Sequence, residues 1–403
     1  MSKKQLGQFF TQKADHILQG LEPYIRGKKV VDPFAGGGDL MNWAKEHGAL
    51  QVKGFDVDPV LVGKKGVLHN DSLLSPRKYS FVITNPPYLN VNKADNETKS
   101  KYFQNTRFED LYHLSLAAIM DSEEGIIIVP INFLSAHNAR KIRNLFFSKF
   151  EIDQMNYFRE QVFPDTTYNV IALHYKKKHA VRDMFSIKTR IFPGNERTEI
   201  RLQREFDWTI GGEDIQTIME TQNVLGVRRL TEFDVEEHRG PVTLKGAHNH
   251  IKTAHNISVA SSFADKLRRN ILLLYAIDSG SEEGKVGLRD ARAHKIEYLV
   301  SKETSRHMIQ LIFEKEVPVK KQERLLDLFN EYVEQLRKKH LSLFLTNYRD
   351  NDRKRISFDF AYKLVNYLYL RHVAPQTSTG RLFFYESMGQ TKYKTRERVG
   401  ISR

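Results

Sequence analysis

The sequence of 403 residues contains no cysteine. Disulfide bonds and zinc sites built from thiolates are therefore excluded. The chain also lacks an apolar run of about 18 residues, the usual signal for a membrane-spanning helix, and its first residues are polar and do not resemble a signal peptide. We therefore expect a soluble cytoplasmic protein with no membrane partner, associated with the nucleoid if it is bacterial. The length is sufficient for two domains with full cores.

Acidic residues are outnumbered by basic ones. Asp and Glu number 49 and Lys and Arg number 63, which gives a formal net charge of +14. Both halves of the chain are basic, and the second half is more so. This balance favours a polyanionic partner such as nucleic acid, although a basic surface can also serve solubility alone.

The tetrapeptide Asn85-Pro86-Pro87-Tyr88 is the most informative string in the chain. It follows the apolar run Tyr79–Thr84, which predicts a buried strand. An amide, a rigid double proline and an aromatic ring at the end of a strand can hold a flat group that carries an amino substituent. The amide side chain then hydrogen-bonds to the edge of this flat group, and the aromatic ring stacks on its face. An ordinary Pro-Pro turn is the alternative, so the surrounding sequence has to decide between them.

A glycine-rich turn and two acidic residues precede this tetrapeptide. Val30-Val31 predicts the end of a buried strand, Asp32–Gly38 forms the turn, and a helix is predicted from Asp39. Asp56 and Asp71 each end a further strand-like segment. An acidic residue about 20 positions after a glycine-rich turn commonly binds a ribose diol. Each acid alone is equally well a helix cap or a turn residue, but their order predicts an open parallel sheet with a ligand crevice at the strand ends.

With these motifs the chain resembles the S-adenosylmethionine-dependent amino-methyltransferases. More closely, it resembles the gamma-class adenine-N6 DNA methyltransferases of Type II restriction–modification systems. Gly7–Thr11 matches the N-terminal cofactor motif, Asp32–Gly38 the cofactor loop, and Asp56 the ribose acid. Asp71 matches the acid that faces the cofactor adenine, and Asn85–Tyr88 matches the catalytic motif.

The resemblance continues to about residue 178, less than half of the chain. Phe108–Tyr112 matches the helix after the catalytic motif, and Gly125–Pro130 matches the fifth strand. Phe163-Pro164, before the strand Asn169–Tyr175, matches a motif that places an aromatic ring beside the target base. The resemblance implies S-adenosyl-L-methionine as the cofactor, with no metal. The implied cofactor-binding residues are Thr11, Asp32, Phe34, Ala35, Gly36, Gly38, Asp56, Val57, Asp71, Ser72 and Asn85.

The resemblance also implies a chemistry for the catalytic residues Asn85, Pro86, Pro87, Tyr88 and Phe163. The Asn85 side-chain oxygen and the Pro86 carbonyl would accept the hydrogens of adenine N6 and expose its lone pair to the sulfonium methyl group. Tyr88 would stack on the base and Phe163 would flank it. The base has to be flipped out of the duplex to reach them. Cytosine-C5 methylation, which needs a cysteine nucleophile, is excluded because the chain has no cysteine.

The predicted fold is an α/β, Rossmann-like methyltransferase sheet with helices on both faces, followed by a basic α+β domain. We expect a catalytic domain over residues 1–180, ending at Lys176–Lys178, a DNA target-recognition domain over 181–375 and a basic tail over 376–403. Leu89–Phe108 is polar and resembles a loop. Core helices are predicted over Lys321–His340 and Phe358–Tyr369 from their apolar spacing.

Other functions remain open at this point. The same tetrapeptide serves enzymes that methylate an RNA base or a glutamine amide of a translation factor. His248, His250 and His255 lie close together, but no cysteine or well-spaced carboxylate completes a metal site. The expected partner is double-stranded DNA. The resemblance allows a cognate restriction endonuclease that acts separately, and we expect a monomer or weak dimer.

Overall fold

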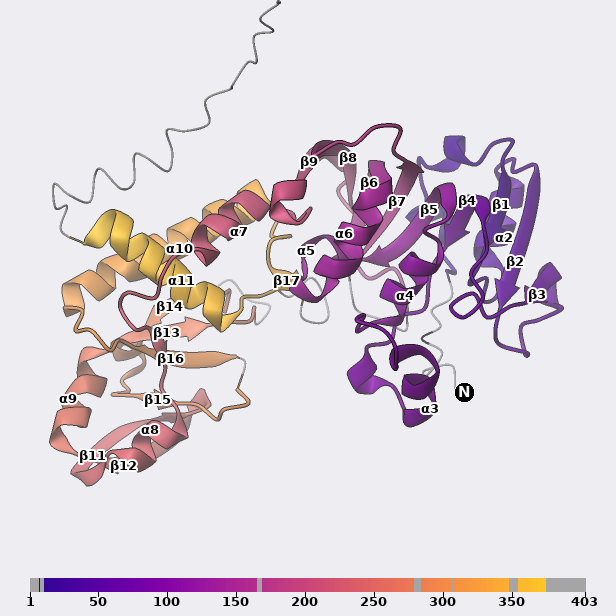
Figure 1. The fold of residues 1–403 in the computed structure, drawn as a ribbon. Helices are drawn as coiled ribbons and strands as arrows, with labels where there is room; N and C mark the ends of the chain where they lie inside the picture. The colour runs from indigo at the N-terminus through magenta and orange to yellow at the C-terminus, as the bar shows by residue number, and fades with distance from the viewer. Residues whose placement is uncertain are drawn as a thin grey trace, which may run out of the picture.

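A computed structural model of the chain describes residues 7, 11–164, 169–278, 284–305, 307–347 and 354–374. Two lobes follow one another along the chain (Figure 1). The predicted basic tail 376–403 and residues 8–10 of the N-terminal motif lie outside the described residues. No helix in the described part of the chain is long and apolar enough to cross a membrane.

The N-terminal lobe is built on a nine-stranded sheet with the order β3-β2-β1-β4-β5-β7-β6-β8-β9. Strands β1 to β5 run parallel, and β7 is antiparallel to both β5 and β6. The order reverses between β1 and β4, and ligands of open parallel sheets bind at such a reversal. The strands are β1 Lys29–Asp32, β2 Gln51–Asp56, β3 Val67–His69, β4 Tyr79–Thr84, β5 Ser122–Pro130, β6 Phe150–Phe158, β7 Val170–Lys177, β8 Met184–Phe192 and β9 Glu196–Gln203.

Helices cover both faces of this sheet, as predicted. Successive side chains of a strand point to opposite faces, so the apolar runs of β4 and β5 are buried on both sides. On one face, α4 and α6 pack against Val82 and Ile127, and on the other, α1 and α2 pack against Phe81 and Ile126. The helices of this lobe are α1 Ala14–Ile17, α2 Asp39–Glu46, α3 Asn96–Thr98, α4 Leu111–Ala118, α5 Asn132–Ser135 and α6 Arg140–Lys149.

The sheet does not end at Lys176–Lys178 as the sequence suggested. β8 pairs in parallel with β6, and β9 pairs with β8, so the sheet extends to Gln203. The boundary expected at residue 180 therefore falls inside the sheet. β8 joins the sheet through β6, and the paired residues Gln154 and Lys188 are 34 positions apart in the sequence, so the local pattern around the triple lysine does not indicate this pairing.

The segment Leu89–Phe108 is not the loop that its polar composition suggested. It forms the short helical turns Val91–Lys93, Asn96–Thr98 and Lys99–Phe103. Tyr102 and Phe103 are buried in a small apolar cluster with Leu89 and Leu111. This segment, which we call the folded insert, lies directly after the tetrapeptide Asn85–Tyr88.

The C-terminal lobe combines small sheets with two long helices. The expected core helices are present as α10 Val319–Lys339 and α11 Phe358–Leu368, which pack on the sheet β10-β16-β13-β14. A second sheet has the order β12-β11-β15. The remaining elements are η6 Arg204–Phe206, α7 Gly212–Met219, β10 Arg228–Arg229, α8 Glu232–Glu237, β11 Arg239–His248, β12 His250–Val259, α9 Ser261–Arg269, β13 Leu272–Tyr275, β14 Gly287–Asp290, β15 Leu299–Val300, β16 Met308–Ile312, β17 Thr346–Asn347 and β18 Lys354–Arg355.

Candidate active site

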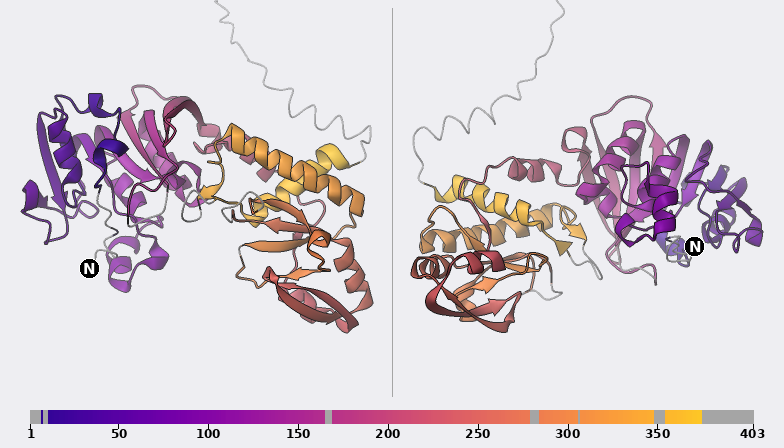
Figure 2. Two further views of the ribbon diagram at one scale, coloured as in Figure 1. Left: turned by 180° about the vertical axis from the view of Figure 1, so that it is seen from behind. Right: turned by 60° about the horizontal axis from the view of Figure 1, so that its bottom comes forward.

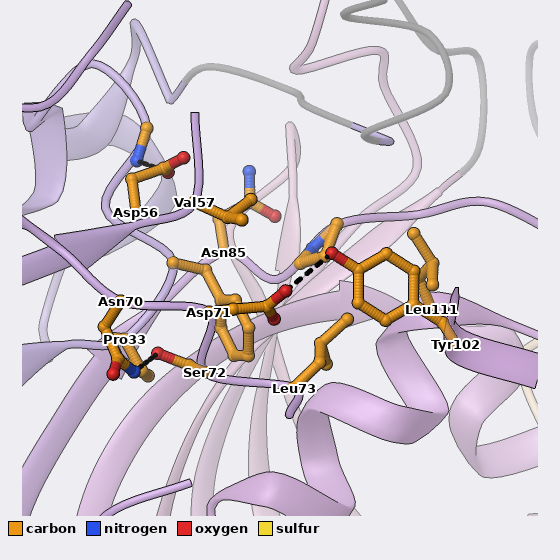
Figure 3. Close-up of a pocket in the computed structure, with 13 residues that line it drawn as sticks. Pro33, Asp56, Val57, Asn70, Asp71, Ser72, Leu73, Asn85, Tyr102 and Leu111 are labelled. Atoms are coloured by element: carbon orange, nitrogen blue, oxygen red, sulfur yellow. Dashed lines mark hydrogen bonds between the residues drawn. The ribbon is translucent and has the colours of Figure 1, made fainter. Parts of the chain in front are cut away.

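A pocket of about 610 Å³ opens at the carboxyl ends of the parallel strands, where the strand order reverses (Figure 3). The side chains that line it come from the segments that follow β1, β2, β3 and β4. A smaller pocket of about 240 Å³ adjoins it, and Phe34, Gly36 and Asn85 line both. The lining of the larger pocket includes the predicted residues Phe34, Gly36, Asp56, Val57, Asp71, Ser72, Asn85 and Pro87, and that of the smaller one includes Thr11, Asp32, Phe34, Ala35, Gly36 and Asn85.

Asp56 holds the glycine-rich turn in place. Its Oδ2 accepts a hydrogen bond from the Gly36 amide at 2.8 Å, and its Oδ1 accepts one from the Asp58 amide at 2.8 Å. Burial raises the pKa of Asp56 above its ordinary value, and the two amide hydrogen bonds oppose this rise. Gly38 is the N-cap residue of α2. Its φ of +78° is a left-handed backbone conformation, which favours glycine. The acid and the turn thus form one unit that borders both pockets.

Asp32 is the most deeply buried acid of the site, at 1% exposure. Its Oδ1 accepts hydrogen bonds from the Thr84 hydroxyl at 2.8 Å and from the Phe34 amide at 3.1 Å. Burial raises the pKa of Asp32 to about 7, although both hydrogen bonds lower it. Asp32 therefore changes its charge near neutral pH.

This shift predicts a pH-dependent stability. Between about pH 4 and pH 7 the unfolded chain releases the Asp32 proton while the folded chain keeps it, so the free energy of unfolding falls as the pH rises, by up to about 1.4 kcal/mol per unit. Asp32→Asn mimics the protonated acid and removes this contribution. We expect the wild type to lose stability relative to Asp32→Asn over that range. Urea unfolding of both proteins at several pH values measures this difference. If the free energies of unfolding of the two proteins change with pH in parallel, the raised pKa of Asp32 is contradicted.

Asp71 is bound by the folded insert. Its Oδ2 accepts a hydrogen bond from the Tyr102 hydroxyl at 3.0 Å (Figure 3). The same oxygen forms an ion pair with Lys101 at 2.9 Å. Next to it, Asn70 donates to the Ser72 hydroxyl at 3.0 Å. Tyr102, Lys101 and Asn70 were not predicted as site residues. The insert therefore closes one end of the larger pocket.

The tetrapeptide Asn85–Tyr88 begins directly after β4. The Asn85 Nδ2 donates to the Thr11 hydroxyl at 3.2 Å, and the Asn85 Oδ1 accepts from the Tyr88 hydroxyl at 2.5 Å. The Tyr88 hydroxyl also lies 2.7 Å from the Ile128 carbonyl of β5. Burial raises the pKa of Tyr88 well above its ordinary value, so the hydroxyl remains a donor. Thr11 and Tyr88 together fix the orientation of the Asn85 amide.

Gly7 connects the N-terminal motif to this tetrapeptide. The Tyr88 amide donates to the Gly7 carbonyl at 2.9 Å. Gly7 has a φ of +63°, and a Cβ atom added there would lie 2.9 Å from the backbone nitrogen and oxygen of Tyr88. Only glycine fits this close approach without strain. The structure thereby brings Gly7 of the N-terminal motif and the tetrapeptide Asn85–Tyr88 together.

Some predicted residues do not line the pockets. Pro86, Tyr88 and Gly38 are absent from the lining of both pockets. Phe163 is 2% exposed and packs in the core beneath α1 and α2. Residues 165–168 next to it lie outside the described part of the chain. The place of Phe163 beside a target base therefore stays a prediction.

Carboxylates dominate the charge of the site. Asp32, Asp39, Asp56 and Asp71 line the two pockets, whereas no Lys or Arg side chain among the described residues does. Such a site favours a ligand that carries positive charge and hydroxyl donors. Among the described residues no cluster of three or more His, Asp or Glu side chains forms a metal site.

One protein-family model matches part of the chain. Residues 10–163 match the model of the Eco57I restriction-modification methylase family. No curated protein matches the chain.

Several solved structures are similar in fold. One is a putative class I S-adenosylmethionine-dependent methyltransferase from Listeria monocytogenes, with 16% identity, a TM-score of 0.34, and coverage of 44% of this chain and 61% of that one. Another is a modification subunit of a putative type I restriction enzyme from Vibrio vulnificus YJ016, with 14% identity, a TM-score of 0.37, and coverage of 71% and 59%. A putative RNA methyltransferase from Pyrococcus horikoshii has 22% identity, a TM-score of 0.33, and coverage of 45% and 90%.

The chain thus spans about three fifths of the first two of these structures. The matched segment 10–163 contains every residue that lines the two pockets. The pocket-bearing part of the N-terminal lobe is therefore similar to the Eco57I restriction-modification methylases.

Proposed function

We propose that this chain is a DNA methyltransferase that transfers a methyl group from S-adenosylmethionine to N6 of a flipped adenine in duplex DNA, as the modification enzyme of a restriction–modification system. The position of Asn85 carries this proposal. Its amide forms part of the wall of both pockets at the strand-order reversal, and the Pro-Pro-Tyr segment follows it. An amide at this point would present an oxygen acceptor to an amino group of the substrate.

The two pockets fit the two ends of S-adenosylmethionine. In the larger pocket Asp56 would accept the ribose hydroxyls, and Asp71 with Ser72 would face the adenine. In the smaller pocket Thr11 and the glycine-rich turn would hold the methionine end, beside the buried carboxylate of Asp32. The negative charge of this lining suits the ammonium and sulfonium groups of that molecule. When bound, it supplies an already activated methyl group.

The residues of the tetrapeptide would prepare the substrate nitrogen. The lone pair of an exocyclic amine is delocalised into the ring, so the amine is a poor nucleophile. The Asn85 oxygen and the Pro86 carbonyl would accept its hydrogens, and the Tyr88 ring would hold the plane of the base. No strong base is needed for this, because positioning supplies much of the rate. Thr11 and Tyr88 already hold the Asn85 amide in one orientation.

Modified-base sequencing tests this function directly. DNA from a host that expresses the protein is compared with DNA from a host that expresses Asn85→Ala. N6-methyladenine at one short recurrent sequence, present only with the wild type, is the expected result. Radiolabelled S-adenosylmethionine then follows the methyl group in a lysate. Label that enters RNA or a protein in place of DNA would overturn the assignment and favour an RNA base or a glutamine amide as the substrate.

A further inference from the structure

The long hairpin β11–β12 of the C-terminal lobe has one covered face and one partly open face. Its strands are antiparallel, and Thr243 pairs with Ser258, Lys245 with Asn256, and Ala247 with Ala254. On the covered face, Leu244, Ile257 and Val259 are buried against Phe263 and Leu267 of α9. Because side chains alternate along a strand, the residues between them point the other way.

The opposite face is covered at Ala247, which is buried with Leu299 and Met308. Its open part, which we call the reading face, consists of Thr243, Lys245, Ala254, Asn256 and Ser258. All five of its side chains are exposed. Together they offer hydroxyl, ammonium, amide and methyl groups, but no carboxylate. The whole segment 239–259 contains no Asp or Glu, although the chain has 49 of them. Two carboxylates contact the hairpin from outside, and both are engaged: Glu297 by the Lys245 amide at 2.8 Å and by Arg268 at 2.9 Å, and Glu232 by the His248 ring at 2.7 Å.

The hairpin is held rigidly from behind. Gly246 lies against β15 so closely that an added Cβ would come within 2.3 Å of the Tyr298 carbonyl. The Tyr298 hydroxyl also forms a hydrogen bond with His255 Nδ1 at 2.9 Å. A fixed backbone places its exposed side chains in a constant pattern, which sequence readout requires. The hairpin and the insert around α3 lie on the same side of the two lobes in the views of Figures 1 and 2.

We propose that the reading face enters the major groove of duplex DNA and recognises base edges there. This inference rests on the proposed function, since it assumes a DNA substrate. The major groove, about 12 Å wide, admits a two-stranded β-ribbon. In such a groove Asn256 would pair with adenine, Lys245 with guanine, and Ala254 would touch a thymine methyl group. The target sequence is then set largely by side chains of the hairpin.

Cross-linking tests the placement, because the chain has no cysteine of its own. Ala254→Cys and Lys338→Cys each introduce a single thiol, to which a benzophenone maleimide is attached. Lys338 is a matched surface control on α10 with a side chain that is 77% exposed. The DNA is a duplex that carries the methylated sequence, or a random duplex pool if no methylation is found. Light should cross-link DNA to position 254 and not to position 338. The reverse pattern, or no cross-link at either position, would overturn the inference.

The role in sequence readout is tested by Asn256→Ala and Lys245→Ala, with Lys338→Ala as the control. We expect each hairpin variant to lower kcat/KM on the wild-type site about tenfold and to relax the recognised sequence at one position, while the control stays within about twofold. Equal melting temperatures show that the fold is kept. If the wild type methylates DNA, and both hairpin variants recognise the same DNA sequence with the same kcat/KM, the proposed role of the reading face is wrong. If DNA cross-links to position 254 without methylation, the inference stands and the proposed function fails.

Discussion

Replacement of Asn85 by alanine is expected to lower methyl transfer by roughly 10²–10³-fold, the range found when one polar group that contacts the reacting centre is removed. The variant loses the side-chain oxygen that would accept a hydrogen of the substrate amine. Its fold should change little, because the Tyr88 hydroxyl keeps the Ile128 carbonyl as an acceptor. Binding of S-adenosylmethionine should also stay within a few-fold, since Asp56 and Asp71 remain.

Asn85→Asp is the matched control. It keeps acceptor oxygens of the same geometry, and the Thr11 hydroxyl can reverse its hydrogen bond and donate to the new carboxylate. We expect this variant to retain far more activity than Asn85→Ala. Single-turnover kinetics with saturating S-adenosylmethionine measure the chemical step, and calorimetry measures cofactor binding. Turnover of Asn85→Ala at the wild-type rate would remove Asn85 from the catalytic role.

The sequence predicts the strands and turns that form the larger pocket because their signals are local. β4 has the predicted bounds Tyr79–Thr84, and α2 begins at the predicted Asp39. The chain returns to the same sheet edge after each strand, so the residues that follow β1 to β4 meet there without further information. This rule alone brings Asp56, Asp71 and Asn85 to one pocket.

Contacts between distant segments could not be predicted in this way. Tyr102 reaches Asp71 only because the insert folds around its own small apolar cluster, which its many polar residues conceal. β8 joins the sheet through a parallel pairing with β6, while β7 pairs with the other edge of β6. Alternation of apolar residues indicates that such a strand exists, but it does not indicate which strand is its neighbour.

The Tyr88 hydroxyl is a further contact that sequence reasoning missed. The motif suggests that only the ring of Tyr88 matters, through stacking on the base. In the structure the hydroxyl also bonds the Asn85 oxygen and the Ile128 carbonyl, a backbone group on the neighbouring strand β5. Tyr88 therefore has two separable contributions. The ring would hold the base. The hydroxyl orients the Asn85 amide, which would act on the amino group of the base.

Substitutions at Tyr88 should separate these contributions. Tyr88→Ala removes both, and we expect kcat/KM to fall about 100-fold, since stacking of a base on an aromatic ring contributes about 1–3 kcal/mol. Tyr88→Phe keeps the ring and loses one hydrogen bond to Asn85, worth about 0.5–1.5 kcal/mol, so kcat/KM should fall by roughly 2- to 12-fold. Duplex affinity should change little in either variant, because phosphate contacts supply most of the binding energy.

A duplex with 2-aminopurine in place of the target adenine distinguishes the two roles, because its fluorescence rises when the base leaves the stack. The wild type and Tyr88→Phe should both raise the emission, since both retain the ring that would hold the extruded base. Tyr88→Ala should give a weaker rise at equal occupancy of the DNA. If Tyr88→Phe lowers kcat/KM as much as Tyr88→Ala but still raises the emission fully, the hydroxyl is the working group. Tyr88 would then act mainly by orienting Asn85, and another side chain would have to hold the base.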